Sequence, residues 1–132
     1  MQISRDLVEE IVAHAREDLP NECCGIVSTR DGNAVQAYRA RNATPSPLRF
    51  EIDPRDLIRI HTDIEGSGLE MGSMYHSHVK SAAYPSQTDV NFAQSWPGVV
   101  WLIVSLAERD APDLRGFRIT GAEVEEVPLT IE

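Results

Sequence analysis

Cysteine and positive charge are both scarce in this sequence. Its only cysteines, Cys23 and Cys24, are adjacent, a spacing that suits neither a normal disulfide between them nor a paired-cysteine zinc knuckle. Without a disulfide framework, a cytoplasmic location is the default expectation. The 12 lysines and arginines are outnumbered by 21 acidic residues, for a formal net charge of -9. Binding to a phosphate backbone needs a clustered basic surface, so we expect a polypeptide partner and no nucleic acid.

Long apolar runs are also absent. No run approaches the ~20 residues that cross a bilayer, and the N-terminus lacks the basic-then-apolar pattern of a secretion signal, so we expect no membrane partner. Repeats, linkers and low-complexity segments are missing too. A chain of 132 residues that is 42% hydrophobic can build its own core. We therefore predict one domain over residues 1–132.

Helical and strand patterns alternate along the chain. Ser4 suits the N-cap of a first helix because its hydroxyl can accept a backbone N–H bond. The pair Asp31-Gly32 suits a tight hairpin turn because glycine accepts a positive φ. The predicted helices span 4–18, 54–65 and 86–95. The predicted strands span 24–29, 34–41, 48–52, 69–78, 99–106, 114–120 and 123–127.

The run from Val99 to Leu106 is continuously apolar, which is typical of a strand covered on both faces. We expect it to be a central strand. The last two strands form a predicted hairpin across Gly121-Ala122. Together these elements predict an α/β fold of the α+β type, a sandwich in which a curved, mostly antiparallel mixed sheet lies between helices.

Metal-binding residue types cluster around position 80. His76 and His78 flank Ser77 on a predicted strand, so the two imidazoles point to the same side. Asp89 follows one turn into a predicted helix. Two imidazoles and a carboxylate are three protein ligands, and catalytic zinc sites keep three such ligands with a fourth position for water. The spacing predicts an open site for one zinc ion at the end of the His-bearing strand.

Amide hydrolysis at such a site also needs a proton carrier and a hydrogen-bond donor. Glu22 is the candidate for the first role, because a carboxylate can take the proton of the attacking water and pass it to a leaving amine. Ser86 is the candidate donor to the developing oxyanion. The alternative for Glu22 is a solvated loop position. The alternative for Ser86 and Asp89 is a helix start, since a Ser-x-x-acid pattern satisfies backbone N–H groups.

Other polar residues are assigned structural roles. Ser77 faces away from the predicted metal, so we expect a buried serine bonded to a backbone group. His14 and His61 lie in predicted helices and are assigned to helix packing or surface positions. Cys24 would share a strand face with Glu22, but a small buried thiol is the default.

A glutamate upstream, then His-Ser-His, seven residues, serine, two residues and aspartate resembles the signature of the JAMM (MPN+) zinc metalloproteases. The resemblance implies the MPN fold and one zinc ion. It also implies roles for five residues: zinc ligation by His76, His78 and Asp89, acid/base catalysis by Glu22, and stabilisation of the tetrahedral intermediate by Ser86. The segments 22–25 and 42–54 are similar to the bacterial subgroup, so the resemblance covers nearly the whole chain.

The resemblance also narrows the substrate. Eukaryotic ubiquitin isopeptidases of this family carry insertions that grip ubiquitin, and this chain resembles the small bacterial members instead. Several of those act on ubiquitin-like sulfur carriers of the ThiS/MoaD type, from whose Gly-Gly end they remove an amino acid or extension. An actinobacterial member that releases cysteine from its carrier is the most similar in kind. The resemblance therefore implies a carrier protein as substrate.

Other functions stay open at this point. A general, deubiquitinase-like isopeptidase and a cell-wall peptidase use the same site, although the missing secretion signal disfavours the second. A non-catalytic MPN scaffold that only binds partners is disfavoured because all the ligands are present. Two histidines and a carboxylate also describe the non-haem iron triad, but the order of the ligands here is the reverse of the usual one. A homodimer through exposed sheet edges is a further expectation.

Overall fold

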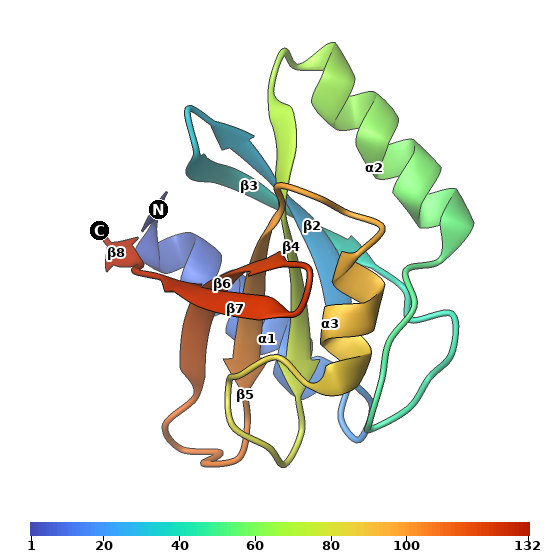
Figure 1. The fold of residues 1–132 in the computed structure, drawn as a ribbon, viewed down its shortest axis with the longest axis vertical. Helices are drawn as coiled ribbons and strands as arrows, with labels where there is room; N and C mark the ends of the chain where they lie inside the picture. Colours follow the sequence, from blue (N-terminus) through green and yellow to red (C-terminus); the bar gives the residue numbers. More distant parts are fainter.

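The computed structural model describes residues 1–132 as a six-stranded sheet between helices (Figure 1). The strand order is β3-β2-β4-β5-β6-β7, and only β4 and β5 run parallel. The helices are α1 (Arg5–Glu17), α2 (Pro54–Gly66) and α3 (Gln87–Ala93). The strands of this sheet are β2 (Cys24–Arg30), β3 (Asn33–Ala40), β4 (Glu70–His78), β5 (Val100–Ser105), β6 (Asp113–Thr120) and β7 (Glu123–Val127). The predicted α+β sandwich is confirmed.

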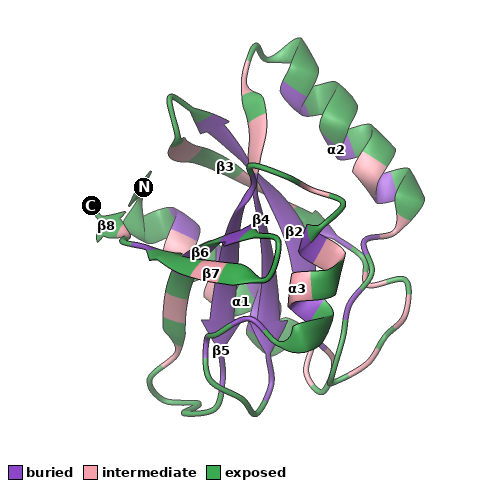
Figure 2. Ribbon diagram, viewed as in Figure 1, coloured by how far each residue is buried: buried purple, intermediate pink, exposed green.

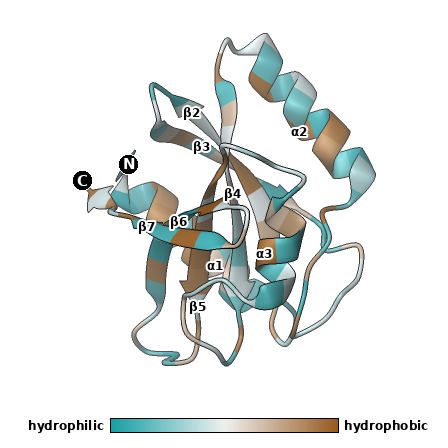
Figure 3. Ribbon diagram, in the orientation of Figure 1, coloured by the Kyte–Doolittle hydropathy of each residue, from teal (hydrophilic) through white to brown (hydrophobic).

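Each face of the sheet has its own hydrophobic core. On one face, Leu7 and Ile11 of α1 pack with Leu102 of β5. On the other face, Ile60 of α2 packs with Trp101 of β5, and α3 contributes to the same cluster. Every residue of β5 is buried (Figure 2), and all of them except the last, Ser105, are hydrophobic (Figure 3). The predicted central strand is confirmed, since a strand covered on both faces is a nearly continuous run of apolar residues.

Local sequence signals set several element ends as predicted. The Ser4 hydroxyl accepts a hydrogen bond from the Leu7 N–H at the start of α1. Asp53 caps α2 in the same way, and Pro54 follows at the first helical position, where its missing N–H costs nothing. Between β2 and β3, Asp31 and Gly32 both have positive φ, 52° and 79°, as a type I′ hairpin turn requires.

The segment 48–52 is not the strand that the sequence predicted. Only an isolated bridge between Asn42 and Ile52 forms there. The Asn42 side chain takes the place of a ladder, because its amide donates to the Glu22 and Arg49 carbonyls and its oxygen accepts from Thr44 and Glu51. Prolines at positions 45 and 47 have no N–H for a ladder. The segment is therefore a loop held by one side chain.

Two smaller differences lie near the end of α3 and at the termini. The helix α3 ends at Ala93 and not near Ser95. The sequence did not predict β1 (Gln2–Ile3) and β8 (Thr130–Ile131), which form a separate two-stranded parallel sheet. Strands of two residues are too short to show a period of two in the sequence. No helix of the chain has the length and apolar character needed to cross a membrane.

The assignment of His14 to helix packing is confirmed. It is buried in α1, its Nδ1 lies 2.7 Å from the hydroxyl oxygen of Tyr75, and its Nε2 lies 3.3 Å from a carboxylate oxygen of Asp18. The ring of Tyr75 lies over Gly25, where any Cβ would collide with it. The hydrogen bond therefore ties α1 to the middle of β4, on the face opposite to α2 and α3.

Candidate metal centre

The structure brings the three predicted ligands together at the end of β4. The Nε2 atoms of His76 and His78 lie 3.1 Å and 3.0 Å from the same oxygen, Oδ2 of Asp89 in α3. The two Nε2 atoms are 3.3 Å apart. All three residues are buried. Strand alternation turns both imidazoles to the face that α3 covers, and this convergence is the geometry of a site able to hold a metal ion.

The hydrogen bond of His78 to a carbonyl fixes which of its ring nitrogens faces Asp89. Its Nδ1 is 2.8 Å from the carbonyl oxygen of Ala82, and a carbonyl can only accept, so Nδ1 carries the proton. In the neutral ring, Nε2 is then an acceptor that faces the carboxylate of Asp89. Acceptor atoms this close repel one another unless a proton or a cation lies between them. A histidine whose other nitrogen donates to a carbonyl is the usual arrangement for a metal ligand.

His76 is held by packing. Its ring stacks on Phe50, with centroids 4.4 Å apart and planes at 23°, and its Nδ1 is buried without a hydrogen-bond partner. Phe50 belongs to the loop that the sequence predicted as a strand, and its contact with the site was not predicted. The one feature of the sequence that could have indicated this contact is the presence of Phe50 in a proline-rich segment, since a large apolar side chain is more often buried than exposed.

Burial and hydrogen bonding act on the pKa values of these groups in opposite directions. Burial lowers the pKa of His76 below its ordinary value. Burial also acts to lower the pKa of His78, but hydrogen bonds to Asp89 and Ala82 outweigh it and raise that pKa. Burial acts to raise the pKa of Asp89, yet the charge of His76 and hydrogen bonds from both imidazoles and the Ser86 N–H hold it well below its usual range. Asp89 is therefore a carboxylate near neutral pH, as metal ligation requires.

Ser86 forms the helix start that was the structural alternative. Its hydroxyl accepts a hydrogen bond from the Asp89 N–H at 3.1 Å, and its own N–H donates to Oδ2 of Asp89 at 3.0 Å, a reciprocal capping box. The hydroxyl proton of Ser86 takes no part in these bonds and can still be donated to a ligand in the cleft that it lines. The capping box also fixes the rotamer of Asp89 and so aims its carboxylate at the histidines.

Glu22 is buried, so the alternative interpretation of Glu22 as a solvated loop residue is wrong. Only 4% of the residue is exposed, and Oε1 of its carboxylate has no hydrogen-bond partner. Its backbone is fixed by bonds to Ser46 and Asn42. Burial raises the pKa of Glu22 to about 8, while His78 acts to lower it and Asp89 to raise it. Glu22, His78 and Ser86 together line a cleft of about 450 Å³.

The remaining polar residues stay outside the centre. The Ser77 hydroxyl accepts a hydrogen bond from the Cys23 N–H at 2.8 Å, on the opposite face of β4, which confirms that it bonds to a backbone group. Cys24 pairs in register with His76, but burial raises the pKa of its thiol far above neutral pH. A protonated thiol is a poor ligand. His61 is exposed on α2.

The fold and the site together define the class of protein. A mixed sheet between helices, with two histidines and an aspartate converging beside a buried glutamate, is the fold and site of a JAMM-type protein. The chain also matches the family model described as prokaryotic homologs of the JAB domain, over residues 4–120. It belongs to the prokaryotic JAB (JAMM/MPN) family.

Two relatives and one solved structure are similar along the chain. A protein of Mycobacterium tuberculosis named CysO-cysteine peptidase is 33% identical over 131 residues, which are 98% of this chain and 89% of the relative. A protein of Haloferax volcanii named desampylase is 35% identical over 141 residues, which are 100% of this chain and 96% of the relative. The solution structure of a Desulfitobacterium hafniense protein has a TM-score of 0.90 at 34% identity, over 99% of this chain and 92% of that one.

Proposed function

We propose that this protein is a zinc-dependent peptidase that hydrolyses an amide bond at the C-terminal Gly-Gly end of a ubiquitin-like sulfur carrier of the ThiS/MoaD type, and releases cysteine or a short extension. The observation that carries the proposal is the convergence of His76, His78 and Asp89 beside the buried Glu22. The name of the Mycobacterium tuberculosis relative, a peptidase of CysO-cysteine, supports both the activity and the cysteine.

The donor set fits zinc. Two imidazole nitrogens and a carboxylate oxygen are ligands that zinc accepts in catalytic sites, and all three atoms lie within 4.8 Å of one another. A bound zinc ion would lower the pKa of a coordinated water to about 7 and polarise the carbonyl of the substrate. One ion uses the whole set, since no fourth His, Cys, Asp or Glu joins the group.

Glu22 is the residue that moves the proton. With the pKa of about 8 that burial gives it against the opposing effect of His78, Glu22 holds a proton near neutral pH while the three ligand residues hold no metal ion. Beside a cation held by the three ligands, the pKa of Glu22 would be lower, and Glu22 would be a carboxylate. It can then accept a proton from the attacking water and deliver it to the leaving amine. The unpartnered Oε1 is free for this transfer.

Ser86 and the loop before α2 shape the rest of the site. The Ser86 hydroxyl lines the cleft and can donate to the carbonyl oxygen as negative charge develops there. The capping box prevents this side chain from turning away. Pro47 and Leu48 form an apolar border of the cleft, which is suited to the small, uncharged Gly-Gly segment.

The first experiment compares the wild type with Glu22→Gln on a small carrier protein ending in Gly-Gly-Cys. We expect both proteins to bind about one zinc ion, and we expect Glu22→Gln to lose about 10²–10⁴-fold in cleavage because it cannot carry the proton. Glu51→Gln, which removes an exposed carboxylate from the neighbouring loop, is the matched control and should cleave like the wild type. Intact mass reports the cleavage and elemental analysis reports the metal.

Three other outcomes of this experiment would each contradict a part of the proposal. Bound zinc without cleavage of any tail would overturn the proposed substrate and leave the metal site intact. Absence of zinc after loading at neutral pH would favour the non-catalytic scaffold. Cleavage that survives in Glu22→Gln would remove Glu22 from the mechanism.

A further inference from the structure

The cleft beside the metal centre contains the only lysine of the chain. Lys80 follows His78 by two residues and lines the cleft with Glu22 and Leu48. Its side chain is exposed, and each of the chain's ion pairs uses an arginine or a histidine instead. Lys80 thus brings to the site a positive charge that no carboxylate of the protein neutralises.

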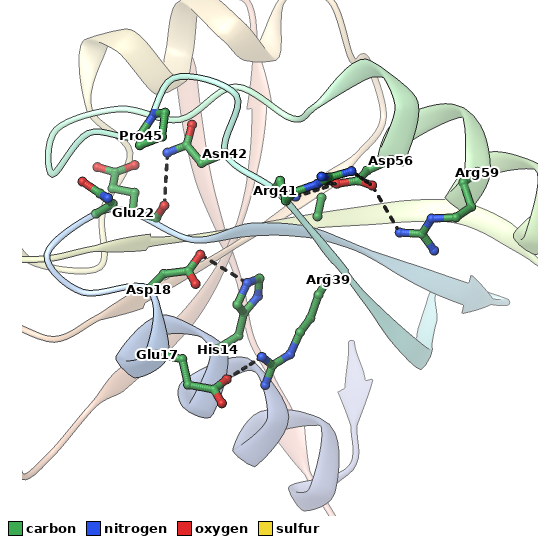
Figure 4. A pocket seen from close by; sticks show the side chains of 12 residues that line it. His14, Glu17, Asp18, Glu22, Arg39, Arg41, Asn42, Pro45, Asp56 and Arg59 are labelled. Atoms are coloured by element: carbon green, nitrogen blue, oxygen red, sulfur yellow. Dashed lines mark hydrogen bonds and ion pairs between the residues drawn. The ribbon is translucent and has the colours of Figure 1, made fainter.

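The neighbouring cavity offers no equivalent charge. It has a volume of about 700 Å³, and Glu22 lies between it and the cleft. Its three arginines are all engaged with carboxylates (Figure 4), in the pairs Arg39–Glu17, Arg41–Asp56 and Arg59–Asp56. Among the residues that line the two cavities, Lys80 is therefore the one lysine or arginine that forms no ion pair with a carboxylate.

On the basis of the proposed function, we infer that Lys80 binds the terminal carboxylate of the single residue that is cleaved from the carrier. Chain geometry places the Cα of Lys80 within roughly 7.6 Å of the Cα of His78. In the substrate, the carboxylate of the single residue that follows the cleaved bond lies only about 3.5 Å from that bond. The flexible lysine side chain spans that separation, and its ammonium group carries three donors.

The overall charge gives this contact a selective effect. A chain with a net charge of -9 repels a free carboxylate, so a single cation in the cleft determines where a terminal anion is accepted. A longer extension places an uncharged amide at the same position, and an isopeptide linkage places an uncharged methylene of the lysine side chain there. Lys80 would therefore favour release of one C-terminal residue over internal and isopeptide cleavage, and so specify the class of substrate.

The test compares two substrates that differ only at the last carbonyl, a carrier ending in Gly-Gly-Cys with a free carboxylate and the same carrier with a C-terminal carboxamide. For the zinc-loaded wild type we expect kcat/KM to be about two- to fivefold higher for the free acid, which is the range of an exposed ion pair. The ratio should fall to about one in Lys80→Met and below one in Lys80→Glu. High salt should reduce the wild-type ratio, because exposed charges are screened.

Arg30→Met is the matched control. It removes one exposed positive charge that forms no ion pair, at the end of β2 farthest from Glu22, and it should keep the wild-type ratio. A free-acid preference that persists in Lys80→Met overturns the inference, because another group then holds the carboxylate. A wild type that cleaves both substrates equally overturns it as well.

A binding measurement separates this inference from the proposed function. Zinc-loaded Glu22→Gln and Glu22→Gln/Lys80→Met are titrated with a tail peptide ending in Gly-Gly-Cys, as free acid and as amide. A preference of about two- to fivefold for the acid that disappears with Lys80 supports the inference even if the wild type cleaves neither carrier, an outcome that defeats only the proposed function. Equal affinity for the two peptides, or no binding of either, overturns the role of Lys80.

Discussion

Two buried carboxylates within one site are kept in opposite protonation states. Asp89 accepts hydrogen bonds from two imidazoles and a backbone N–H, which hold its pKa well below the usual range against the effect of burial. Burial raises the pKa of Glu22 to about 8, and Oε1 of its carboxylate has no donor. The donors around each group decide the outcome. One acid is thus ionised and suited to the proposed metal ligation, and the other is suited to exchange a proton near neutral pH.

This difference predicts how metal-free protein responds to pH. Because the pKa of Glu22 is about 8 in the folded state and about 4.5 when exposed, the folded state binds more protons between these values, and Glu22 makes the free energy of unfolding fall as pH rises. Between pH 5 and pH 8, the free energy of unfolding of Glu22→Gln should rise by about 1–3 kcal/mol relative to that of the wild type. Urea unfolding with a chelator present measures this. Glu51→Gln should show no such rise. If the stability of Glu22→Gln had the same pH dependence as that of the wild type, the raised pKa of a buried Glu22 would be contradicted.

At the scale of elements, two helices begin with the same capping geometry and only one of them belongs to the site. The hydroxyl of Ser4 accepts the Leu7 N–H at 3.1 Å, and the hydroxyl of Ser86 accepts the Asp89 N–H at 3.1 Å. The first cap only begins α1. The second begins α3 and at the same time orients Asp89, a proposed metal ligand.

The two serines therefore form a matched pair for mutation. Ser4→Ala and Ser86→Ala should each lower the free energy of unfolding by about 1 kcal/mol, because each removes one N-cap. Only Ser86→Ala should also reduce kcat, by about 10²-fold or more, because it removes the proposed donor to the oxyanion. Thermal unfolding and steady-state kinetics are measured on both. Equal activity of the two variants would assign Ser86 to capping alone.

The whole molecule assembles the centre from distant segments. The histidines end β4, Asp89 is in α3, and Glu22 precedes β2 and is held by the loop around Asn42. The seven residues of α3 pack on the sheet through Ala93, Val90 and Phe92, and Asp89 adds a polar attachment to the histidines of β4. A metal ion that bridges Asp89 and the histidines would fix α3 on the sheet.

Metal removal should therefore loosen one element and lower overall stability. With free zinc at 100 times its dissociation constant, binding adds about 2.7 kcal/mol to the free energy of unfolding, so a chelator should lower Tm by several degrees. Amide hydrogen exchange in α3 should increase more than exchange in β5. His76→Ala serves as the control, since its Tm should not respond to the chelator. An unchanged Tm in the wild type would mean that the ion is not bound at this centre.

Signals that the sequence carries locally were confirmed by the structure. The pair His76 and His78 follows the strand period, the Ser86–Asp89 spacing follows the first turn of a helix, and Asp31-Gly32 specifies its turn. Each depends on residues a few positions apart, whose geometry the backbone fixes by itself. These signals sufficed for the three helices and the six strands of the main sheet, for the central strand and for the convergence of the three predicted ligand residues.

The remaining features depend on contacts between distant segments, and only the tertiary structure decided them. The sequence did not determine that Glu22 is buried, because its burial depends on packing against segments far along the chain. It did not show that Asn42 replaces a strand by holding a loop, that the termini pair as β1 and β8, or that Lys80 has no ionic partner in the cleft. Local patterns fix the directions of side chains, but burial and charge environment arise only when separate elements pack together.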